Sequence, residues 1–600
     1  MTRVCAVLVT LAIGIPALAQ TTYYVSPAGS DANTGKSRGS AWRTLTRSGE
    51  LRAGDRLLLA GGATFNGSIH LKASQIALGS YGAGRATIDS GDETAIDGSD
   101  LSNLTISNLR LRGASLAHMV LNRNGIDLTN RNGRARSIRI ENVEITGFSF
   151  AAIQVQAGDR LTGVDVIAIE NALIHEIGYA GIVIDCDEPG AFTDVSVRHS
   201  DIGPITGYRN SYGVVVQGSG SGISVKGAYG GSISGNVVHD SGTTAGGGNF
   251  GIEIIRTIGI EVDSNEVRNM HKDDVPGAVA GAIDIDGGTS ASVRYNYTHD
   301  NDGPGIRLCS CSAALKETFV HHNISQNDGS PAAIDIEGSI SSSAIVVAHN
   351  TVEARSGTAL LVTGLTSTLV ANNLLLTHGG TAADIVSGTT MKANDYYDYA
   401  GAPRLVMNGS ASSSLAGWGQ DSLGLSADPQ LIGGAGGALL PSASLSDLNA
   451  FRITPNSPLI DKAIDLQPSG YSIGPRDFFG GESATLFGSD IGAYEYRPDP
   501  YPPSIDPVAS QAVIAGDTQD VDVWFHDADG TSGLVLSLVN PPAGVTLRRA
   551  GGEHAIVTLA PLSAGKATVT VRVKDESGFA DEVSFAVTAT GGSRVRAVRH

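Results

Sequence analysis

The middle of the chain contains a degenerate repeat in which a short apolar strand ends in a turn that carries asparagine. From Asn236 onward these asparagines follow one another at intervals of 29, 31, 27, 27 and 23 residues. The repeat comprises the segments Ile169-Glu-Asn171, Val262-Asp-Ser-Asn265, Val293-Arg-Tyr-Asn296, Val320-His-His-Asn323, Val347-Ala-His-Asn350 and Val370-Ala-Asn-Asn373. Asn142 and Asn236 belong to the same series, and His199 is its stand-in in one repeat.

Each repeat also holds a second strand of the form Gly/Ala-Ile-x-Ile. Strands of four or five residues with an apolar period of 2 cannot bury their apolar face alone, so successive coils are expected to stack. Helical solenoids are disfavoured because their apolar spacing is 3.6 residues. We therefore predict an all-β chain whose main body, from about Thr21 to Asp395, is a right-handed parallel β-helix with the asparagines stacked in a ladder.

These asparagine-turn coils resemble the parallel β-helix (PbH1) repeats of a family that includes pectate and alginate lyases, polygalacturonase-like hydrolases and mannuronan epimerases. The opening segments Tyr23–Gly35 and Ala41–Leu45 resemble the entry strand and cap of many secreted members. The resemblance covers about 370 residues. It implies the fold and a polysaccharide ligand, and it leaves the reaction open.

The first nineteen residues have the layout of an export signal. Arg3 precedes an apolar run from Val4 to Ile15, and Ala17-Leu-Ala19 is a small-residue cleavage site. The run is too short to span a bilayer, and no later stretch is apolar enough to do so. We expect a secreted protein without a membrane span, located outside the cell, at the cell surface or in the periplasm.

Composition narrows the classes further. The chain contains 77 glycines, 17% charged residues and 41% hydrophobic residues, a composition that suits many short strands joined by tight turns. Its length of 600 residues suggests two or three domains. A net charge of −19 argues against nucleic acid as a partner. Removal of the signal leaves Cys186, Cys309 and Cys311, which allow at most one disulfide, and the short Cys309–Cys311 spacing argues against zinc.

Two further regions follow the β-helix, which we place at residues 20–400 after a signal at 1–19. Residues 401–497 hold Pro455–Ile464, Gly474–Asp477 and Asp490–Tyr496, which together resemble the choice-of-anchor Q segment of bacterial surface β-helices. A proline-rich linker at 498–503 leads to short alternating strands over 504–590, predicted as a β-sandwich that resembles immunoglobulin-like or cadherin-like modules. A basic tail fills 591–600, and we expect a monomer.

A calcium site in the β-sandwich is a weaker hypothesis. Asp527-Ala-Asp529-Gly530 has the oxygen ligands that calcium prefers, but a polar turn is the more common role of such a segment.

On the Ile-x-Ile strands the isoleucines point inward, so the residues between and after them form two outward rows. The first row contains Asp127, Gln154, Val183, Val215, Glu253, Asp284, Arg307 and Asp335. The second row contains Thr129, Gln156, Asp185, Gln217, Ile255, Asp286, Cys309 and Glu337. Because neighbouring coils lie about 4.8 Å apart, the acids and Arg307 are predicted to form one patch over three coils.

Three interpretations of this acidic patch are open. Asp284, Asp286, Asp335 and Glu337 could bind Ca²⁺, which removes their mutual repulsion. Alternatively, two carboxyl groups with different pKa values could serve as acid and base in glycoside hydrolysis. The patch could also be a solvated face neutralised by Arg307.

Polar loops flank the patch. His271, Lys272 and Asp274 lie in the turn before it, Asp302 lies in the next turn, and Glu253 lies on the preceding coil. Lys272 could remove the proton α to a uronate carboxyl while a metal ion and Arg307 stabilise the charge that develops. Lys272 and Arg307 are thus the candidate catalytic residues, both expected to face solvent, and His271, Asp274, Glu253 and Asp302 are the candidate substrate-binding residues.

The leading hypothesis is a secreted enzyme that cleaves an acidic polysaccharide by β-elimination. A glycoside hydrolase or a uronate C5-epimerase is the next candidate. No complete lyase motif is present, and the Asn-Thr-Asp, Gly-His-Gly and Arg-x-Lys set of polygalacturonases is also absent, which disfavours a hydrolase more than a lyase. A non-catalytic adhesive or sugar-binding surface protein is the candidate from another class. Trp42, Trp418 and Trp524 all lie outside the central coils, which favours recognition by charge over sugar stacking.

Overall fold

The computed structural model describes most of the chain. The described residues are 20–114, 116, 123–207, 219–243, 249–272, 279–364, 367–433, 445–483, 488–497, 503–527, 534–561, 563–575 and 579–590. The predicted signal peptide, the basic tail, most of the proline-rich linker, Asp274 and Asp529 lie outside these ranges. None of the described helices is both long and apolar enough to cross a membrane.

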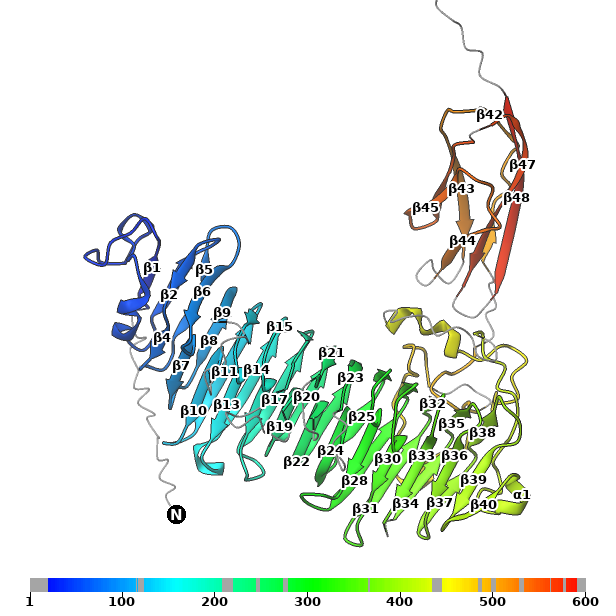
Figure 1. Ribbon diagram of the computed structural model, residues 1–600, viewed down its shortest axis with the longest axis horizontal. Helices are drawn as coiled ribbons and strands as arrows, with labels where there is room; N and C mark the ends of the chain where they lie inside the picture. The colour runs from blue at the N-terminus through cyan, green and yellow to red at the C-terminus, as the bar shows by residue number, and fades with distance from the viewer. Residues whose placement is uncertain are drawn as a thin grey trace, which may run out of the picture. The chain divides into compact units, whose positions relative to one another are not determined.

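The main body is a right-handed parallel β-helix, as predicted, and its coils are visible as stacked arrows in Figure 1. Three rows of strands form its faces. The first row is β4 (Ile69–Leu71), β7 (Ile96–Ser99), β10 (Ile126–Asn130), β13 (Ala151–Ala157), β16 (Ala180–Asp185), β19 (Ser221–Lys226), β22 (Asn249–Asp263), β24 (Ala280–Thr289), β27 (Ile306–Cys309), β30 (Ala332–Glu337), β33 (Thr358–Thr363), β36 (Thr381–Ile385) and β39 (Arg404–Met407). We call the outer side of this row the first face.

The other two rows complete each coil. The second row is β1 (Thr22–Val25), β2 (Arg56–Ala60), β5 (Ala77–Tyr81), β8 (Leu104–Ser107), β11 (Ala135–Glu141), β14 (Val164–Glu170), β17 (Phe192–Arg198), β20 (Tyr229–Ser234), the second half of β22, β25 (Ser292–Arg294), β28 (Leu315–His321), β31 (Ser343–Ala348), β34 (Thr368–Ala371) and β37 (Thr389–Lys392). The third row is β3 (Thr64–Asn66), β6 (Ala86–Gly91), β9 (Leu109–Gly113), β12 (Glu144–Thr146), β15 (Leu173–His175), β18 (Asp201–Ile202), β21 (Val237–Ser241), β23 (Glu266–Met270), β26 (Tyr297–His299), β29 (Ile324–Gln326), β32 (Thr351–Ala354), β35 (Leu374–Thr377) and β38 (Asp395–Asp398).

Short elements close the β-helix at its ends. At the start these are the 3-10 helices η1 (Arg38–Ser40) and η2 (Leu45–Glu50), and at the end the antiparallel strand β40 (Ser410–Ser412) and helix α1 (Leu415–Trp418). Further 3-10 turns are η4 (Arg160–Thr162), η5 (Leu445–Phe451) and η6 (Gln467–Ser469).

The core of the β-helix is a stack of aliphatic side chains. The two isoleucines of each Ile-x-Ile strand point inward, and Ile283, Ile285 and Ile306 are fully buried. Each buried side chain of this kind stabilises the fold by about 2 kcal/mol relative to exposure. The inward row therefore fixes which residues point outward on the first face.

The predicted asparagine ladder is confirmed. The Asn296 side chain donates to Asn323 Oδ1 at 2.9 Å, and Asn323 donates in the same way to Asn350 at 2.9 Å. Asn236, Asn265 and Asn373 continue the same pattern in their own coils. Each asparagine also binds backbone groups of the neighbouring coils, so the polar groups at this corner are satisfied without water.

The early end of the ladder differs from the prediction. Asn142, Asn171 and His199 occupy the position before the ladder, where the backbone has a positive φ. Ser200 takes the ladder position beside Asn236, because its N–H donates to Asn236 Oδ1 at 3.0 Å. Asparagine tolerates the left-handed region well, which explains why the same residue type recurs at both positions.

The residues after the β-helix divide between two compact units. The first unit contains residues Met1–Ala427 together with Lys462–Gly481 and Ile491–Ala493, and the second contains the remainder. In the first unit the segment Lys462–Gly481 returns to the outside of the second row. Ile464 exchanges two hydrogen bonds of 2.9 Å with the Asn372 side chain, and Leu466 packs with Val346 and Ala371. The predicted segment 401–497 is therefore shared between the two units.

The C-terminal strands form the predicted β-sandwich. One sheet contains β41 (Ser504–Ile505), β43 (Gln519–His526), β46 (His554–Leu559) and β45 (Val545–Gly551). The other contains β42 (Gln511–Ile514), β48 (Ala580–Thr590), β47 (Gly565–Lys574) and β44 (Val535–Val539). Alternating residues such as Val521, Val523 and Phe525 point into a core of their own.

We predict that Asn323→Ala lowers the free energy of unfolding by about 3 kcal/mol, because it leaves the buried N–H groups of Asn296 without their acceptor. Chemical denaturation followed by circular dichroism measures the change. Asn132→Ala, in an exposed turn, is the control and should change stability by no more than about 0.5 kcal/mol. Equal losses in the two variants would contradict a structural role for the ladder.

Candidate functional site

The two predicted outward rows exist on the first face. Glu253, Asp284, Arg307 and Asp335 lie directly opposite one another on β22, β24, β27 and β30. The second outward row of residues brings Asp286, Cys309 and Glu337 into line on β24, β27 and β30. Stacking at about 4.8 Å per coil therefore gathers these acids and Arg307 into one cluster.

One coil differs from the predicted rows. Val215 and Gln217 lie outside the described residues, and strand β19 supplies the outward positions instead. Ser224 is opposite Glu253, and Lys226 is opposite Ile255. The sequence Gly222-Ile-Ser-Val225 has the repeat pattern, so the same signal could have located this strand.

Arg307 is buried, which corrects the expectation that it faces solvent. Its residue exposure is 9%, and its guanidinium lies 5.7 Å from the centre of the Phe250 ring. One guanidinium nitrogen lies 2.9 Å from Glu337 Oε2, and another lies 3.8 Å from Asp284 Oδ1. Burial alone would lower the pKa of Arg307, but the charges of Asp284, Glu337 and Asp335 outweigh it and raise this pKa, so Arg307 stays a cation.

Asp284 and Asp335 flank Arg307 and are also buried. Burial raises the pKa of Asp335 to about 7, with a further upward contribution from Glu337, and it raises the pKa of Asp284 well above its usual value. Neither Asp335 oxygen, nor Oδ1 of Asp284, has a hydrogen-bond partner among the described groups. A single cation does not balance two buried carboxylates, so at neutral pH a proton supplies part of the compensation.

Glu253 is the half-buried acid of the first outward row of residues. Burial raises its pKa to about 7, against the hydrogen bond of 2.9 Å that Ser224 Oγ donates to Glu253 Oε2, and the charge of Asp286 raises it further. Glu253 therefore exchanges its proton near neutral pH, which is the property of a general acid.

Asp286 has a different environment from Glu253. The Ser312 backbone N–H donates to Asp286 Oδ1 at 2.7 Å, and the Ser312 hydroxyl donates to the other oxygen. Glu253 and Asp286 lie on neighbouring strands two residues out of register, which separates their backbones by roughly 8 Å.

The described cysteines next to Asp286 form the one disulfide that the sequence allows. Cys309 is bonded to Cys311, and Cys186 is buried and free. The two sulfur atoms and a carboxylate oxygen of Asp286 lie within 4.8 Å of one another, but disulfide sulfurs do not act as thiolate ligands. The pair instead forms the wall beside Arg307, whose guanidinium lies 3.3 Å from each sulfur.

The four acids predicted to bind Ca²⁺ do not converge on one point. The guanidinium of Arg307 lies among them, and Asp286 is engaged by Ser312. Among the described residues, Asp286 lies close to the two cysteines as a possible group of metal ligands, and the other three acids are not part of that group. The arrangement fits a guanidinium better than a calcium ion, so calcium stays a prediction and no step below depends on it.

The described loop residues His271, Lys272 and Asp302 have contacts of their own, none of which is with this cluster. Lys272 and His271 follow strand β23 of the third row, and it is the backbone N–H of Lys272 that contacts Asp302, at 3.1 Å. The His271 ring lies 3.5 Å from the same carboxylate. These three residues thus contact one another at a coil corner before β24, while Asp274 lies outside the described residues.

A basic pocket adjoins the cluster, and sequence analysis missed it. It has a volume of about 300 Å³ and is lined by Arg256, Thr257, Gly288, Thr289 and Lys316, among others. Gly288 follows Asp286 by two residues on β24, and Thr257 lies opposite Gly288. Thr257 Oγ1 and Arg256 Nε are buried without a hydrogen-bond partner among the described groups. The Arg256 guanidinium already pairs with Asp187 at 2.8 Å, so Lys316 and the two unused donors are the groups that suit an anionic ligand.

Comparisons with known proteins found similar solved structures at low sequence identity. No protein-family model matches the chain, and no curated protein matches it. Among solved structures, the complex of XylC with xylose is 10% identical, covers 79% of this chain and 98% of its own, and has a TM-score of 0.39. Pectate lyase Pel9A (13% identity, 80% and 97% coverage, TM-score 0.32) and a rhamnogalacturonan lyase (13%, 77% and 99%, 0.33) are similar at the same level.

The raised pKa of Asp335 predicts how stability depends on pH. Protonation of Asp335 stabilises the folded state. This contribution is fully present below pH of about 4, the pKa of an aspartate in the unfolded chain, and it is lost as pH rises through about 7. We expect Asp335→Asn to lose less stability than the wild type between pH 5 and pH 8, by on the order of a few kcal/mol. Denaturant titrations at several pH values measure this.

The control is Asp100→Asn. Backbone hydrogen bonds, first from Arg131, lower the pKa of Asp100, so it is ionised over this whole range and its replacement should leave the slope unchanged. Parallel stability curves for wild type and Asp335→Asn would contradict a protonated Asp335.

Proposed function

We propose that this protein is a carbohydrate-active enzyme that hydrolyses glycosidic bonds in an acidic polysaccharide lying along the first face. The observation that carries the proposal is the pairing of Glu253, whose pKa is about 7, with Asp286, whose carboxylate accepts two hydrogen bonds. A pair of carboxyl groups, one of which can donate a proton near neutral pH, is the chemical requirement for this reaction.

In the proposed mechanism the two groups work from opposite sides of the scissile bond. Glu253 donates its proton to the glycosidic oxygen as the bond from that oxygen to the anomeric carbon breaks. Asp286 accepts a proton from a water molecule, whose oxygen attacks the anomeric carbon. The mechanism requires carboxyl groups about 6.5 to 9.5 Å apart, which leaves room for this water. The product would have inverted configuration.

The basic pocket supports an acidic substrate. A sugar bound at Asp286 would place its neighbour close to Arg256 and Lys316, since the pocket begins two residues further along β24. Lys226 adds a third cation on β19, although Asp187 already pairs with it at 2.6 Å. Local cations on a chain with a net charge of −19 favour recognition of carboxylate or sulfate groups on the polymer.

Hydrolysis fits the site better than the β-elimination that the sequence first suggested. Elimination requires a base, and the sequence offered Lys272 for that role, with Arg307 as the cation that stabilises the developing charge. Lys272 lies at a coil corner, where its backbone N–H donates to Asp302, and no contact joins it to the Arg307 cluster among the described residues. Asp284 and Asp335 are too deeply buried to touch a substrate, so we assign them to holding Arg307 in place.

The test uses Glu253→Gln and Asp286→Asn with a panel of uronate and sulfated polysaccharides. Each variant should lower kcat and kcat/KM together by at least about 100-fold, because the group it replaces acts in the transition state. The wild-type rate should fall as pH rises through about 7, where Glu253 loses its proton. New reducing ends report hydrolysis, and absorbance of unsaturated uronate reports elimination.

Glu261→Gln provides a matched control, because Glu261 lies on the same strand but pairs with Arg294 away from the first face. It should retain wild-type activity. Unsaturated products would contradict hydrolysis, and full activity in Glu253→Gln would contradict the assignment of the acid. Inactivity of the wild type on the whole panel would favour the non-catalytic sugar-binding alternative.

A further inference from the structure

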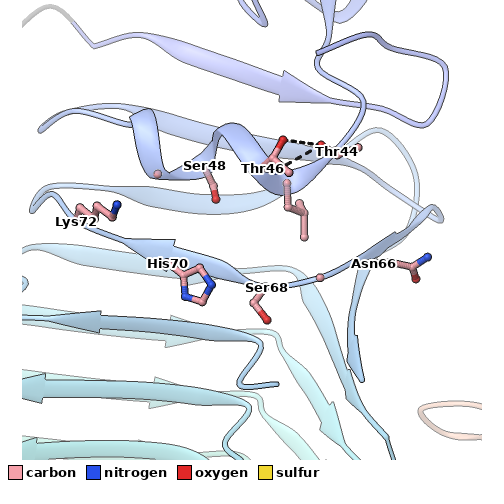
Figure 2. A pocket seen from close by; sticks show the side chains of 10 residues that line it. Thr44, Thr46, Ser48, Asn66, Ser68, His70 and Lys72 are labelled. Carbon is pink, nitrogen blue, oxygen red and sulfur yellow. Dashed lines mark hydrogen bonds between the residues drawn. The ribbon is translucent and has the colours of Figure 1, made fainter. Parts of the chain in front are cut away.

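A second pocket lies at the opening end of the β-helix. It has a volume of about 310 Å³ and is bounded by η2 on one side and by the segment 66–72 around β4 on the other. Figure 2 shows Ser48 on η2 facing the strand that carries Ser68 and His70, with Lys72 and Asn66 toward opposite ends. Thr44 and Thr46 complete a lining composed mostly of polar side chains.

The lining offers unused hydrogen-bonding groups. Ser68 Oγ is buried and has no partner among the described groups. His70 Nδ1 lies 2.7 Å from Asp97 Oδ2, so in the neutral ring this nitrogen donates its hydrogen and Nε2 remains an acceptor. A ligand rich in hydroxyl groups can satisfy both, since each hydroxyl donates and accepts.

Lys72 provides the charge. Its Nζ lies near η2, 4.0 Å from the position that a Cβ on Gly49 would occupy. The neighbouring acids are engaged elsewhere, because Glu50 pairs with Arg47 at 2.7 Å and Asp97 pairs with His70. The ammonium group is therefore available to an anionic ligand at the pocket wall.

We propose that this pocket binds one uronic acid residue, with its carboxylate at Lys72 and its ring hydroxyls at Ser68, His70 and Asn66. The site is separate from the proposed hydrolytic pair. His70 and Glu253 occupy the same outward row, and β4 and β22 are six coils apart, or roughly 29 Å. Binding here does not depend on the proposed hydrolysis.

The experiment measures binding of D-galacturonate and D-glucuronate to the full chain by calorimetry. Glu253→Gln serves as the background protein, so that the result does not depend on the proposed hydrolysis. We expect saturable binding of at least one uronate that Lys72→Met weakens by at least about tenfold, whereas Lys392→Met, on the exposed lysine of β37, leaves it unchanged. D-galactose, D-glucose and acetate test whether carboxylate and hydroxyls are both required.

Gly49→Leu gives an independent test by filling the pocket. A Cβ at Gly49 meets no atom nearer than Lys72 Nζ, so this variant is expected to fold and to lose uronate binding. The proposal is overturned if no uronate binds, if Lys72→Met and Gly49→Leu bind as well as the background protein, or if acetate or the neutral sugars bind equally well. Binding that persists in an inactive enzyme supports the pocket even if the hydrolysis proposal fails.

Discussion

The hydrogen bonds between successive asparagine side chains hold the coils of this protein in register. Each ladder asparagine accepts from the backbone and side chain of one neighbour and donates to the next, as Asn323 does between Asn296 and Asn350. The buried corner therefore satisfies its polar groups only when the coils keep their spacing. With the spacing and the inward isoleucines fixed, the position of every outward residue follows.

Stacking also creates the electrostatic problem that the first face solves. Five acids lie on the first face between β22 and β30, which belong to four successive coils. Because the coils are about 4.8 Å apart, repulsion between these acids would oppose folding if all were ionised. Arg307 compensates part of the charge, and burial raises the pKa values of Glu253, Asp284 and Asp335 so that protons compensate more. The same burial that stabilises the cluster supplies a proton donor near neutral pH.

The sequence predicted the rows and the ladder because both depend on local periodicity. It placed Asp284, Arg307 and Asp335 in one line, and the strand register confirms this. It did not reveal that Arg307 is buried, because exposure depends on groups such as Phe250 that the repeat pattern does not place. It also did not predict the contact of Lys272 with Asp302, since a loop's path does not follow from spacing.

Pockets were the least predictable feature. Arg256 and Thr257 lie on β22, whereas Lys316 lies on β28 of a later coil, and the repeat pattern does not predict that they line one pocket. The pocket at Lys72 similarly needs η2 to lie over β4, a contact between segments with no shared pattern.

Likewise, Asn142 and Asn171 fit the repeat, although their backbone conformation places them one residue before the ladder.

The most direct test of this account is the titration of the Glu253 carboxyl group by difference infrared spectroscopy. The carbonyl band of a protonated carboxylic acid that disappears in Glu253→Gln should be present in the wild type at pH 6. It should be half lost at about pH 7, where burial beside Ser224 and Asp286 places the pKa. A band that titrates near 4.3, as an unperturbed glutamate does, would contradict the proposed general acid and with it the proposed reaction.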